Sequence, residues 1–446
     1  MINLFYSYNQ QAQDLHYSLQ AAGYEQPTVV IRDGGFLPEQ VASPLKFLLD
    51  QAGSAFQGRP RYFNEIDLPE YWEIKANSQN GEILDHGQVR GKIEYCRQDR
   101  RRLVAKVKWL DLKGTVRAID HYNQWGWKFA VTSCDAKGNE AMTSFFASSG
   151  QEVLVHNHFT GDYIYNAPDG RIVSFRDVNQ LVAYFLQASD YDASSIAFNS
   201  LGTCLFSAMQ VKPKPDKNLL FWQEISQGGV PDNMRYLLAG NLKRTKVIVQ
   251  DQAEYQKLVS QLDRETAKRV FFLGQIYPFK RENRHRSRAL IFTNSDQIEG
   301  LKQLVEALPE LHFDVAAVTE MSSRLLNFGK YENVSLYPVV RDADVAELLK
   351  TDDTYLDINY ANEILNAGRQ AFENNMVVFA FRDTMHAPSY TAPENVFAAG
   401  DAEGLVHELQ AILADQAAFD LALARQHEFA GAETPEHYRQ VLDEWQ

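Results

Sequence analysis

The chain of 446 residues is about three times as long as a typical domain, so two or three domains are expected. Hydrophobic residues make up 45% of it and charged residues 23%, proportions that exclude a disordered or fibrous protein. The formal net charge is −14, and residues 291–446 hold 27 acidic but only 9 basic side chains. An acidic C-terminal third repels phosphate backbones, so no nucleic-acid partner is expected.

The three cysteines are far apart and form no Cys-x-x-Cys pair, so neither a disulfide framework nor a zinc site is expected. The first residues contain no basic segment followed by an apolar stretch of signal length. No run approaches the roughly 18 apolar residues of a membrane span. We therefore expect a cytoplasmic protein without a resident metal or cofactor.

The first block is discontinuous and comprises residues 1–59 and 174–270. Apolar residues spaced by three or four predict a helix over Gln10–Ala22, and a β-branched run predicts a strand over Pro27–Ile31. The same alternation returns after residue 174, with a predicted helix at Phe175–Leu186 and a strand at Ser195–Phe198. Alternating strands and helices predict a parallel, Rossmann-like sheet.

The second block, residues 60–173, has a different pattern. From residue 114 onward its glycines recur every 9 to 12 residues, with short β-branched and aromatic runs between them, such as the predicted strand Val116–Tyr122. The glycines are Gly114, Gly126, Gly138, Gly150, Gly161 and Gly170. Short strands separated by regularly spaced turn signals predict an antiparallel β-meander. We expect this meander to be an insertion in the first α/β domain.

The third block, residues 271–446, alternates strands and helices again, with candidate strands at Ala289–Thr293, Phe313–Val318 and Val377–Phe381. It predicts a second Rossmann-like domain, whose last helix crosses back toward the first. Two such α/β domains usually face a cleft at the carboxyl ends of their strands, where ligands bind.

Few motifs suggest catalysis. The chain has no Gly-x-Ser-x-Gly elbow and no phosphate loop ending in Gly-Lys-Ser/Thr, and Gly34-Gly35 fits a tight turn. His156 and His158 lie on one strand face, where a metal site needs a third ligand and cross-strand packing is the simpler interpretation. Two basic runs, one from Arg97 to Arg102 and one from Lys280 to Arg288, fit either phosphate binding or a solvated surface.

Residues 289–308 resemble the donor-domain entry of retaining GT-B glycosyltransferases. In that family a strand leads to an Arg and then to a Lys-Gly pair, and the two cations neutralise a sugar-nucleotide diphosphate. Here Asn294 stands at the Arg position and Glu299 at the Lys position, while Gly300 matches. The resemblance therefore implies the scaffold without its phosphate-binding charge.

Residues 355–379 resemble the glycosyltransferase element in which two glutamates flank seven residues. In this chain the two positions hold Asn362 and Gln370, and Glu363 lies one position away. A slip of one residue turns a helical side chain by about 100°. Both acids are thus replaced by amides, which implies degenerate donor chemistry.

The whole chain resembles the GtfB-type family of stabilising, non-catalytic subunits of the accessory-Sec O-GlcNAc transferase complex, a degenerate GT-B glycosyltransferase. The resembling segments run through most of the length and include Leu103–Asp111, His158–Asp162, Phe221–Glu224, Asn294–Gly300, Tyr355–Asn359 and Ala371–Asn375. The resemblance implies a catalytic O-GlcNAc transferase partner, in a hetero-oligomer that is a heterotetramer in this family. It also implies a Ser/Thr-rich acceptor from serine-rich-repeat adhesins, modified before export, and peripheral association with the inner membrane face.

The β-meander is the expected partner-binding domain, because an open sheet offers edge strands to another chain. Tyr122, Trp125, Trp127 and Phe129 are the candidate partner contacts, since aromatic residues are favoured at interface cores. The alternative is that these rings cover the sheet's own core.

Candidate acceptor contacts are Lys280, Arg281 and Arg286, with the acceptor held in the cleft between the α/β domains. The alternative function is an active retaining GT-B glycosyltransferase that uses UDP-GlcNAc. That alternative requires Glu363 or Glu373 as the missing acid, or Lys280 and Arg281 as phosphate ligands. A third interpretation is a structural chaperone that stabilises its partner through the β-meander alone.

Overall fold

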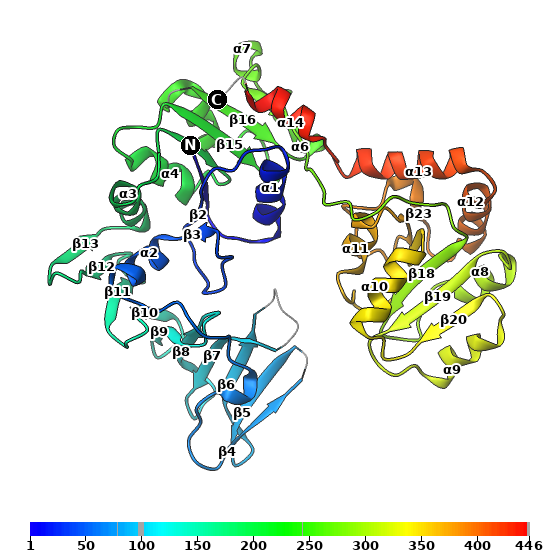
Figure 1. Ribbon diagram of the computed structural model, residues 1–446, viewed down its shortest axis with the longest axis horizontal. Helices are drawn as coiled ribbons and strands as arrows, with labels where there is room; N and C mark the ends of the chain where they lie inside the picture. The colour runs from blue at the N-terminus through cyan, green and yellow to red at the C-terminus, as the bar shows by residue number, and fades with distance from the viewer. Residues whose placement is uncertain (78, 97–101, 243, 444–446) are drawn as a thin grey trace. The chain divides into compact units, whose positions relative to one another are not determined.

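A computed structural model describes residues 1–77, 79–96, 102–242 and 244–443. The chain forms two compact units, one containing Met1–Phe272 and the residues from Val441 onward, the other Leu273–Gln440 (Figure 1). Within the described part of the chain, no helix has the length and apolar character needed to cross a bilayer.

The first unit contains a seven-stranded parallel sheet, in the order β17-β16-β15-β14-β1-β2-β3. Its central strands are buried on both faces, as parallel sheets covered by helices require. The strands are β1 (Ile2–Phe5), β2 (Thr28–Val30), β3 (Val41–Ala42), β14 (Ser195–Phe198), β15 (Lys217–Trp222), β16 (Thr245–Val249) and β17 (Val270–Phe272).

Helices connect these strands. They are α1 (Gln10–Ala21), α2 (Pro44–Gln51), α3 (Val178–Ala188), α4 (Thr203–Gln210), α5 (Asp232–Tyr236), α6 (Gln252–Val259) and α7 (Arg264–Ala267). The Asn9 side chain caps α1, the Ser43 hydroxyl caps α2 and the Asp177 carboxylate caps α3, each accepting a hydrogen bond from a backbone N–H of the first turn. The Rossmann-like sheet predicted for the first block is confirmed.

The insertion between β3 and β14 is a ten-stranded antiparallel meander, in which each strand pairs with its neighbours in the chain. The strands are β4 (Trp72–Ala76), β5 (Asn80–Asp85), β6 (Gln88–Tyr95), β7 (Val104–Leu110), β8 (Val116–Tyr122), β9 (Lys128–Cys134), β10 (Glu140–Phe146), β11 (Glu152–Asn157), β12 (Tyr163–Asn166) and β13 (Ile172–Phe175). We call it the add-on sheet. Its edge strands are β4 and β13, and β4 lies at the end farther from α2 (Figure 1).

The periodic glycines occupy the hairpin turns of the add-on sheet. All six have φ between 81° and 86°, a conformation that costs glycine little. In the β7–β8 turn, the Asp111 carboxylate accepts from the N–H groups of Lys113 and Thr115, and in the β9–β10 turn Asp135 does the same for Lys137 and Asn139. The predicted antiparallel meander is confirmed, and its turns explain the spacing of the glycines.

Helices α2 and α3 connect the add-on sheet to the Rossmann sheet. Leu45, Leu48 and Leu49 of α2 and Leu181 of α3 share one buried cluster with side chains of β9 to β13. On the other side of α3, Val182, Phe185 and Leu186 belong to the Rossmann core. Both faces of α3 are therefore buried, and the two sheets are parts of one folded unit.

The second unit contains a six-stranded parallel sheet in the order β20-β19-β18-β21-β22-β23. The strands are β18 (Arg288–Thr293), β19 (His312–Ala317), β20 (Val334–Tyr337), β21 (Thr354–Asp357), β22 (Val377–Phe381) and β23 (Val396–Phe397). The helices are α8 (Leu301–Ala307), α9 (Ser323–Leu326), α10 (Asp342–Thr351), α11 (Ala367–Glu373), α12 (Ala402–Ala414) and α13 (Gln416–Phe429). The last helix, α14 (Pro435–Leu442), begins in this unit, and its final residues belong to the first unit. The second Rossmann-like domain is confirmed.

Candidate functional site

The loops after β18 and β21 hold the positions where donor chemistry was considered. Glu299 is partly exposed, and its carboxylate is hydrogen-bonded within the fold. Its carboxylate accepts hydrogen bonds from the Tyr360 hydroxyl at 2.8 Å and from the Gly400 N–H at 3.1 Å. The hydrogen bond to this carboxylate raises the pKa of Tyr360. The Glu299 carboxylate thus links three loops by hydrogen bonds, and it stands at the position where a GT-B enzyme needs a cation.

The other three predicted degenerate positions hold uncharged amides. Asn294 and Asn362 are exposed, and the Gln370 amide donates to the Leu365 carbonyl oxygen. Glu363, one position from Asn362, accepts a hydrogen bond from the Gly368 N–H at 3.0 Å. Glu363 therefore caps the start of α11.

Two of the predicted acceptor contacts, Arg281 and Arg286, also have internal partners. Arg281 and Arg286 both pair with the buried carboxylate of Asp353, at 2.6 Å and 3.0 Å. Burial alone would raise the pKa of Asp353, but the hydrogen bonds and charges of the two arginines outweigh it and hold the pKa below its usual value. These pairs account for both arginines within the fold, and their contact with an acceptor stays a prediction.

Lys280 pairs with Glu373 at 2.9 Å, and Glu373 is also bound by Arg369 at 2.6 Å. Glu373 is 7% exposed. Lys280 and Glu373, two of the residues that the alternative glycosyltransferase function would use, are thus bound to each other. Of the other basic run, Arg97, Arg100 and Arg101 lie outside the described residues, while the Arg102 guanidinium lies 4.7 Å from the Phe63 ring centre.

The four aromatic residues predicted to meet a partner lie mainly inside the chain. Tyr122 and Phe129 are 5% and 4% exposed, in two different buried clusters. Trp125 and Trp127 both lie in the turn between β8 and β9. Their spacing of two residues in the sequence predicted that they would share one strand face, and that prediction is wrong. The ring centre of Phe56 lies 4.8 Å from that of Trp125 and 6.4 Å from that of Trp127. For the two tryptophans, which are partly exposed, partner contact stays a prediction.

This turn docks on the Gly34-Gly35 loop of the Rossmann sheet. Gln124 donates its backbone N–H to the Gly35 carbonyl oxygen at 2.8 Å, and its side-chain amide to the Leu37 carbonyl oxygen at 2.8 Å. Gly35 has φ +86°, and a Cβ there would lie 2.7 Å from Cε1 of Phe129. Gly35 therefore allows a close approach between the two sheets.

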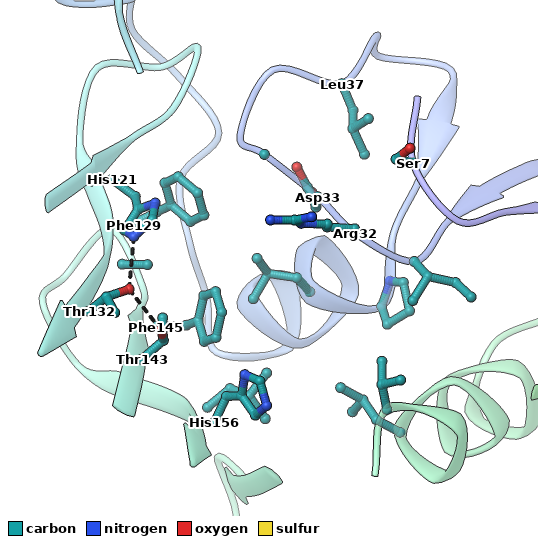
Figure 2. Close-up of a pocket in the computed structure, with 18 of the residues that line it drawn as sticks. Ser7, Arg32, Asp33, Leu37, His121, Phe129, Thr132, Thr143, Phe145 and His156 are labelled. Atoms are coloured by element: carbon teal, nitrogen blue, oxygen red, sulfur yellow. Dashed lines mark hydrogen bonds between the residues drawn. The ribbon is translucent and has the colours of Figure 1, made fainter. Parts of the chain in front are cut away.

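Beside this junction the first unit encloses a cavity of about 690 Å³. One wall is the inner face of the add-on sheet, with side chains from β7 to β12. The opposite wall is formed by the segments after the carboxyl ends of β1 and β2, including Ser7, Arg32 and Asp33 (Figure 2). Ligands of open α/β sheets bind at this end of the strands. The cavity is the candidate functional site.

A row of hydrogen-bonded side chains crosses the sheet wall. The His121 Nε2 and Thr132 Oγ1 atoms lie 2.9 Å apart, and Thr132 Oγ1 lies 2.7 Å from Thr143 Oγ1 (Figure 2). Thr143 Oγ1 in turn lies 2.8 Å from His158 Nε2. We call these four residues the His–Thr row. Both threonines are buried, so their hydroxyls depend on these partners for hydrogen bonding.

Two histidines of this wall, His121 and His156, have lowered pKa values. Burial, aided by the charge of Lys106, lowers the pKa of His121 to about 4. Burial and the neighbouring His158 lower the pKa of His156 to about 4. The His156 ring stacks on the Tyr163 ring at 4.1 Å, and burial raises the pKa of that tyrosine to about 12. The two neutral imidazole rings add polar atoms to this wall without adding charge.

His156 and His158 are thus packed across strands, as the simpler interpretation of the sequence held. Among the described residues, no group of three or more His, Cys, Asp or Glu side chains is placed to hold a metal ion. The His–Thr row was not predicted from the sequence. Successive members lie on either side of a turn glycine, namely Gly126, Gly138 and Gly150, but this spacing alone does not give the strand register that brings them together.

Four family models match consecutive parts of the chain: the GtfB N-terminal domain at residues 2–48, the GtfB middle domain at 72–176, the GtfB third domain at 179–262 and the GftB/GlyA-F C-terminal domain at 289–426. The chain is 38% identical over 443 residues to the UDP-N-acetylglucosamine–peptide N-acetylglucosaminyltransferase stabilizing protein GtfB of Streptococcus pneumoniae serotype 4, covering 99% of both. The chain belongs to the GtfB family. The sequence-based prediction of a stabilising, non-catalytic subunit is confirmed.

Solved structures agree with this family assignment. A chain of the GtfA/B complex bound to UDP and GlcNAc superposes on the whole chain with a TM-score of 0.94 at 36% identity, and each chain is covered completely. The pneumococcal O-GlcNAc transferase GtfA, in complex with UDP and GlcNAc, superposes with a TM-score of 0.51 at 12% identity over 99% of this chain and 98% of its own. GtfA shares the fold alone with this GtfB-family chain.

Proposed function

We propose that this stabilising subunit also holds the acceptor polypeptide for a catalytic O-GlcNAc transferase partner. The acceptor is a Ser/Thr-rich repeat of an adhesin, modified before accessory-Sec export. The two kinds of subunit assemble into a hetero-oligomer, a heterotetramer by family resemblance. The same resemblance is the basis for placing the complex in the cytoplasm, peripherally at the inner face of the cell membrane.

The hydrogen bonds that Glu299 makes within the fold are the main support for this proposal. A diphosphate donor brings two negative charges, and transferases offset them with cations or helix N-termini. Here the loop offers Asn294 and a carboxylate that already binds Tyr360 and Gly400. Asp357 adds a further anion, whose carboxylate accepts hydrogen bonds from the backbone N–H and ring Nδ1 of His386. An α/β scaffold that does not bind a sugar-nucleotide donor can instead hold a polypeptide.

The add-on sheet supports the proposed contact with the partner. Its outermost strand β4 hydrogen-bonds to β5 on one side only, and its residues alternate between partly buried and exposed. Open edges of this kind pair with strands of another chain. The exposed Tyr71, 80% accessible, directly precedes β4. We propose that the partner contacts this edge.

The acceptor role is tested by fluorescence anisotropy with a labelled Ser/Thr-rich repeat peptide and the full chain, without partner or nucleotide. Saturable binding is the expected result, of modest affinity because an extended, low-complexity peptide loses entropy on binding. If the peptide fails to bind while the chain still stabilises its partner, the acceptor role is wrong. The chain is then a structural chaperone that acts through the add-on sheet.

A further inference from the structure

We infer that the cavity beneath the add-on sheet binds hydroxyl-bearing side chains of the acceptor, and that the His–Thr row selects them. This inference rests on the proposed acceptor-holding function and assigns a place to it. The cavity lies wholly within the first unit, between the sheet's inner face and the segments that follow β1 and β2.

The His–Thr row can reverse its hydrogen bonds. In one arrangement the ring N–H of His158 donates to Thr143, Thr143 donates to Thr132, and Thr132 donates to the bare Nε2 of His121. In the other arrangement every bond runs the opposite way, with the same number of protons. Each histidine then changes tautomer, so its Nδ1 atom changes between donor and acceptor. A row that can offer either role suits a hydroxyl group, which both donates and accepts.

The charge of the cavity also favours a neutral ligand. Two cations, Arg32 and Lys106, and two anions, Asp33 and Glu140, line it. The Asp33 carboxylate is already bound by the Ser43 hydroxyl at 2.6 Å and the Gly35 N–H at 2.7 Å. A lining with balanced charges favours neither a phosphate nor a strongly basic peptide. It suits uncharged peptide and hydroxyl groups.

The remaining lining provides apolar contact. Phe129 and Phe145 present rings from the sheet, and Leu37 lies on the opposite wall (Figure 2). Tyr163 of β12 also lines the cavity. A volume of about 690 Å³ falls within the range in which proteins bind ligands. Apolar walls with a few fixed polar groups are the usual composition of such sites, with the polar groups setting specificity. Threonine methyl groups and peptide methylenes would contact the rings.

The test compares two labelled peptides on the full chain by fluorescence anisotropy: a Ser/Thr-rich repeat and the same sequence with every Ser and Thr replaced by Ala. Wild-type protein is expected to bind the hydroxyl-bearing peptide at least tenfold more tightly. Thr143→Val keeps the side-chain shape and removes the central hydroxyl, and it should reduce that preference to less than twofold. Ser144→Ala removes a hydroxyl from the opposite face of the same strand and should leave the preference unchanged.

A second variant guards against misfolding, because Thr143→Val leaves the buried Thr132 and His158 short of a partner. Ser7→Leu narrows the cavity from the opposite wall without touching the His–Thr row, and should weaken binding of both peptides at least fivefold. An unchanged preference in Thr143→Val, together with unchanged affinity in Ser7→Leu, overturns the assignment to this cavity but leaves acceptor binding standing. If wild-type protein binds neither peptide, both the inference and the acceptor role fall.

Discussion

The backbone N–H of Gln124 donates a hydrogen bond to the carbonyl oxygen of Gly35 across 2.8 Å. This bond joins the β8–β9 turn of the add-on sheet to the loop that follows β2 of the Rossmann sheet. It holds together the two walls of the candidate site. The junction therefore fixes the shape of the cavity as well as the stability of the first unit.

Gly35→Ala should destabilise the first unit by about 2–4 kcal/mol. The residue has φ +86°, and its new Cβ would lie 2.7 Å from the Phe129 ring and 3.1 Å from Asn123, so backbone strain adds to overpacking. Gly34→Ala is the matched control, since a Cβ there meets nothing within 4 Å. Urea unfolding of the full chain measures both. Equal midpoints for the two variants would show that the close approach is unimportant.

Trp125→Ala should mainly reduce the stability of the chain and not its intrinsic affinity for the partner. The indole packs on Phe56 at 4.8 Å, and the Lys46 ammonium lies 5.8 Å from its ring centre. Losing this partly buried ring should cost about 2–3 kcal/mol. Thermal unfolding and partner affinity are measured on the same preparation. A large loss of affinity in a variant with wild-type stability would instead restore Trp125 as an interface residue.

Tyr71→Ala should have the opposite profile. The side chain is 80% exposed beside the open edge of β4, so its removal should leave stability within about 0.5 kcal/mol of wild type. Partner affinity should fall about tenfold, because exposed aromatic residues often anchor interfaces. Leu112→Ala, at an 84% exposed position in the β7–β8 turn, is the control for a general surface effect. Unchanged partner affinity in Tyr71→Ala would argue against the β4 edge as the contact.

Acidification should destabilise the first unit through His121. The pKa of His121 is lowered to about 4, mainly by burial, whereas an unfolded histidine has a pKa of about 6.5. Between these values the unfolded chain binds the extra proton, so stability falls as the pH decreases through this window. From pH 7 to pH 5 this histidine should account for about 2 kcal/mol.

The corresponding measurement is the urea midpoint of wild type and of His121→Gln at both pH values. The variant should lose less stability on acidification, even if it is less stable at pH 7. His86→Gln, at a side chain that is 85% exposed, should keep the wild-type pH dependence. The same pH dependence in all three proteins would show that His121 does not titrate as its burial indicates.

Local patterns in the sequence were sufficient to predict much of the fold. The strand predicted at Val116–Tyr122 is β8, because turn glycines and alternating residues specify a hairpin without help from distant parts of the chain. Strand β1, Ile2–Phe5, was missed because four residues, with Asn3 among them, are too few to show a periodicity. Strand β4 was missed because it is an edge strand, exposed at Glu73 and Lys75.

The site was harder to predict than the fold. Asn294 and Glu299 were identified because a family motif gave each position an expected charge. The His–Thr row has no such motif, since its members come from different hairpins and meet only when the strand register is known. The aromatic residues near Trp125 were predicted as candidate partner contacts, with a core role as the alternative. Sequence alone could not decide between the two, because it does not show that the Gly34-Gly35 loop and Phe56 pack against that turn.

The most direct test of the non-catalytic account is a calorimetric titration of the full chain with UDP-GlcNAc. Because Glu299 is an anion bound to Tyr360 and Gly400 where a phosphate-binding cation is needed, no saturable heat should appear up to millimolar nucleotide. The catalytic partner, titrated in the same buffer, is the positive control. Saturable binding at micromolar concentration would contradict the account and restore the active retaining GT-B glycosyltransferase as the function of this chain.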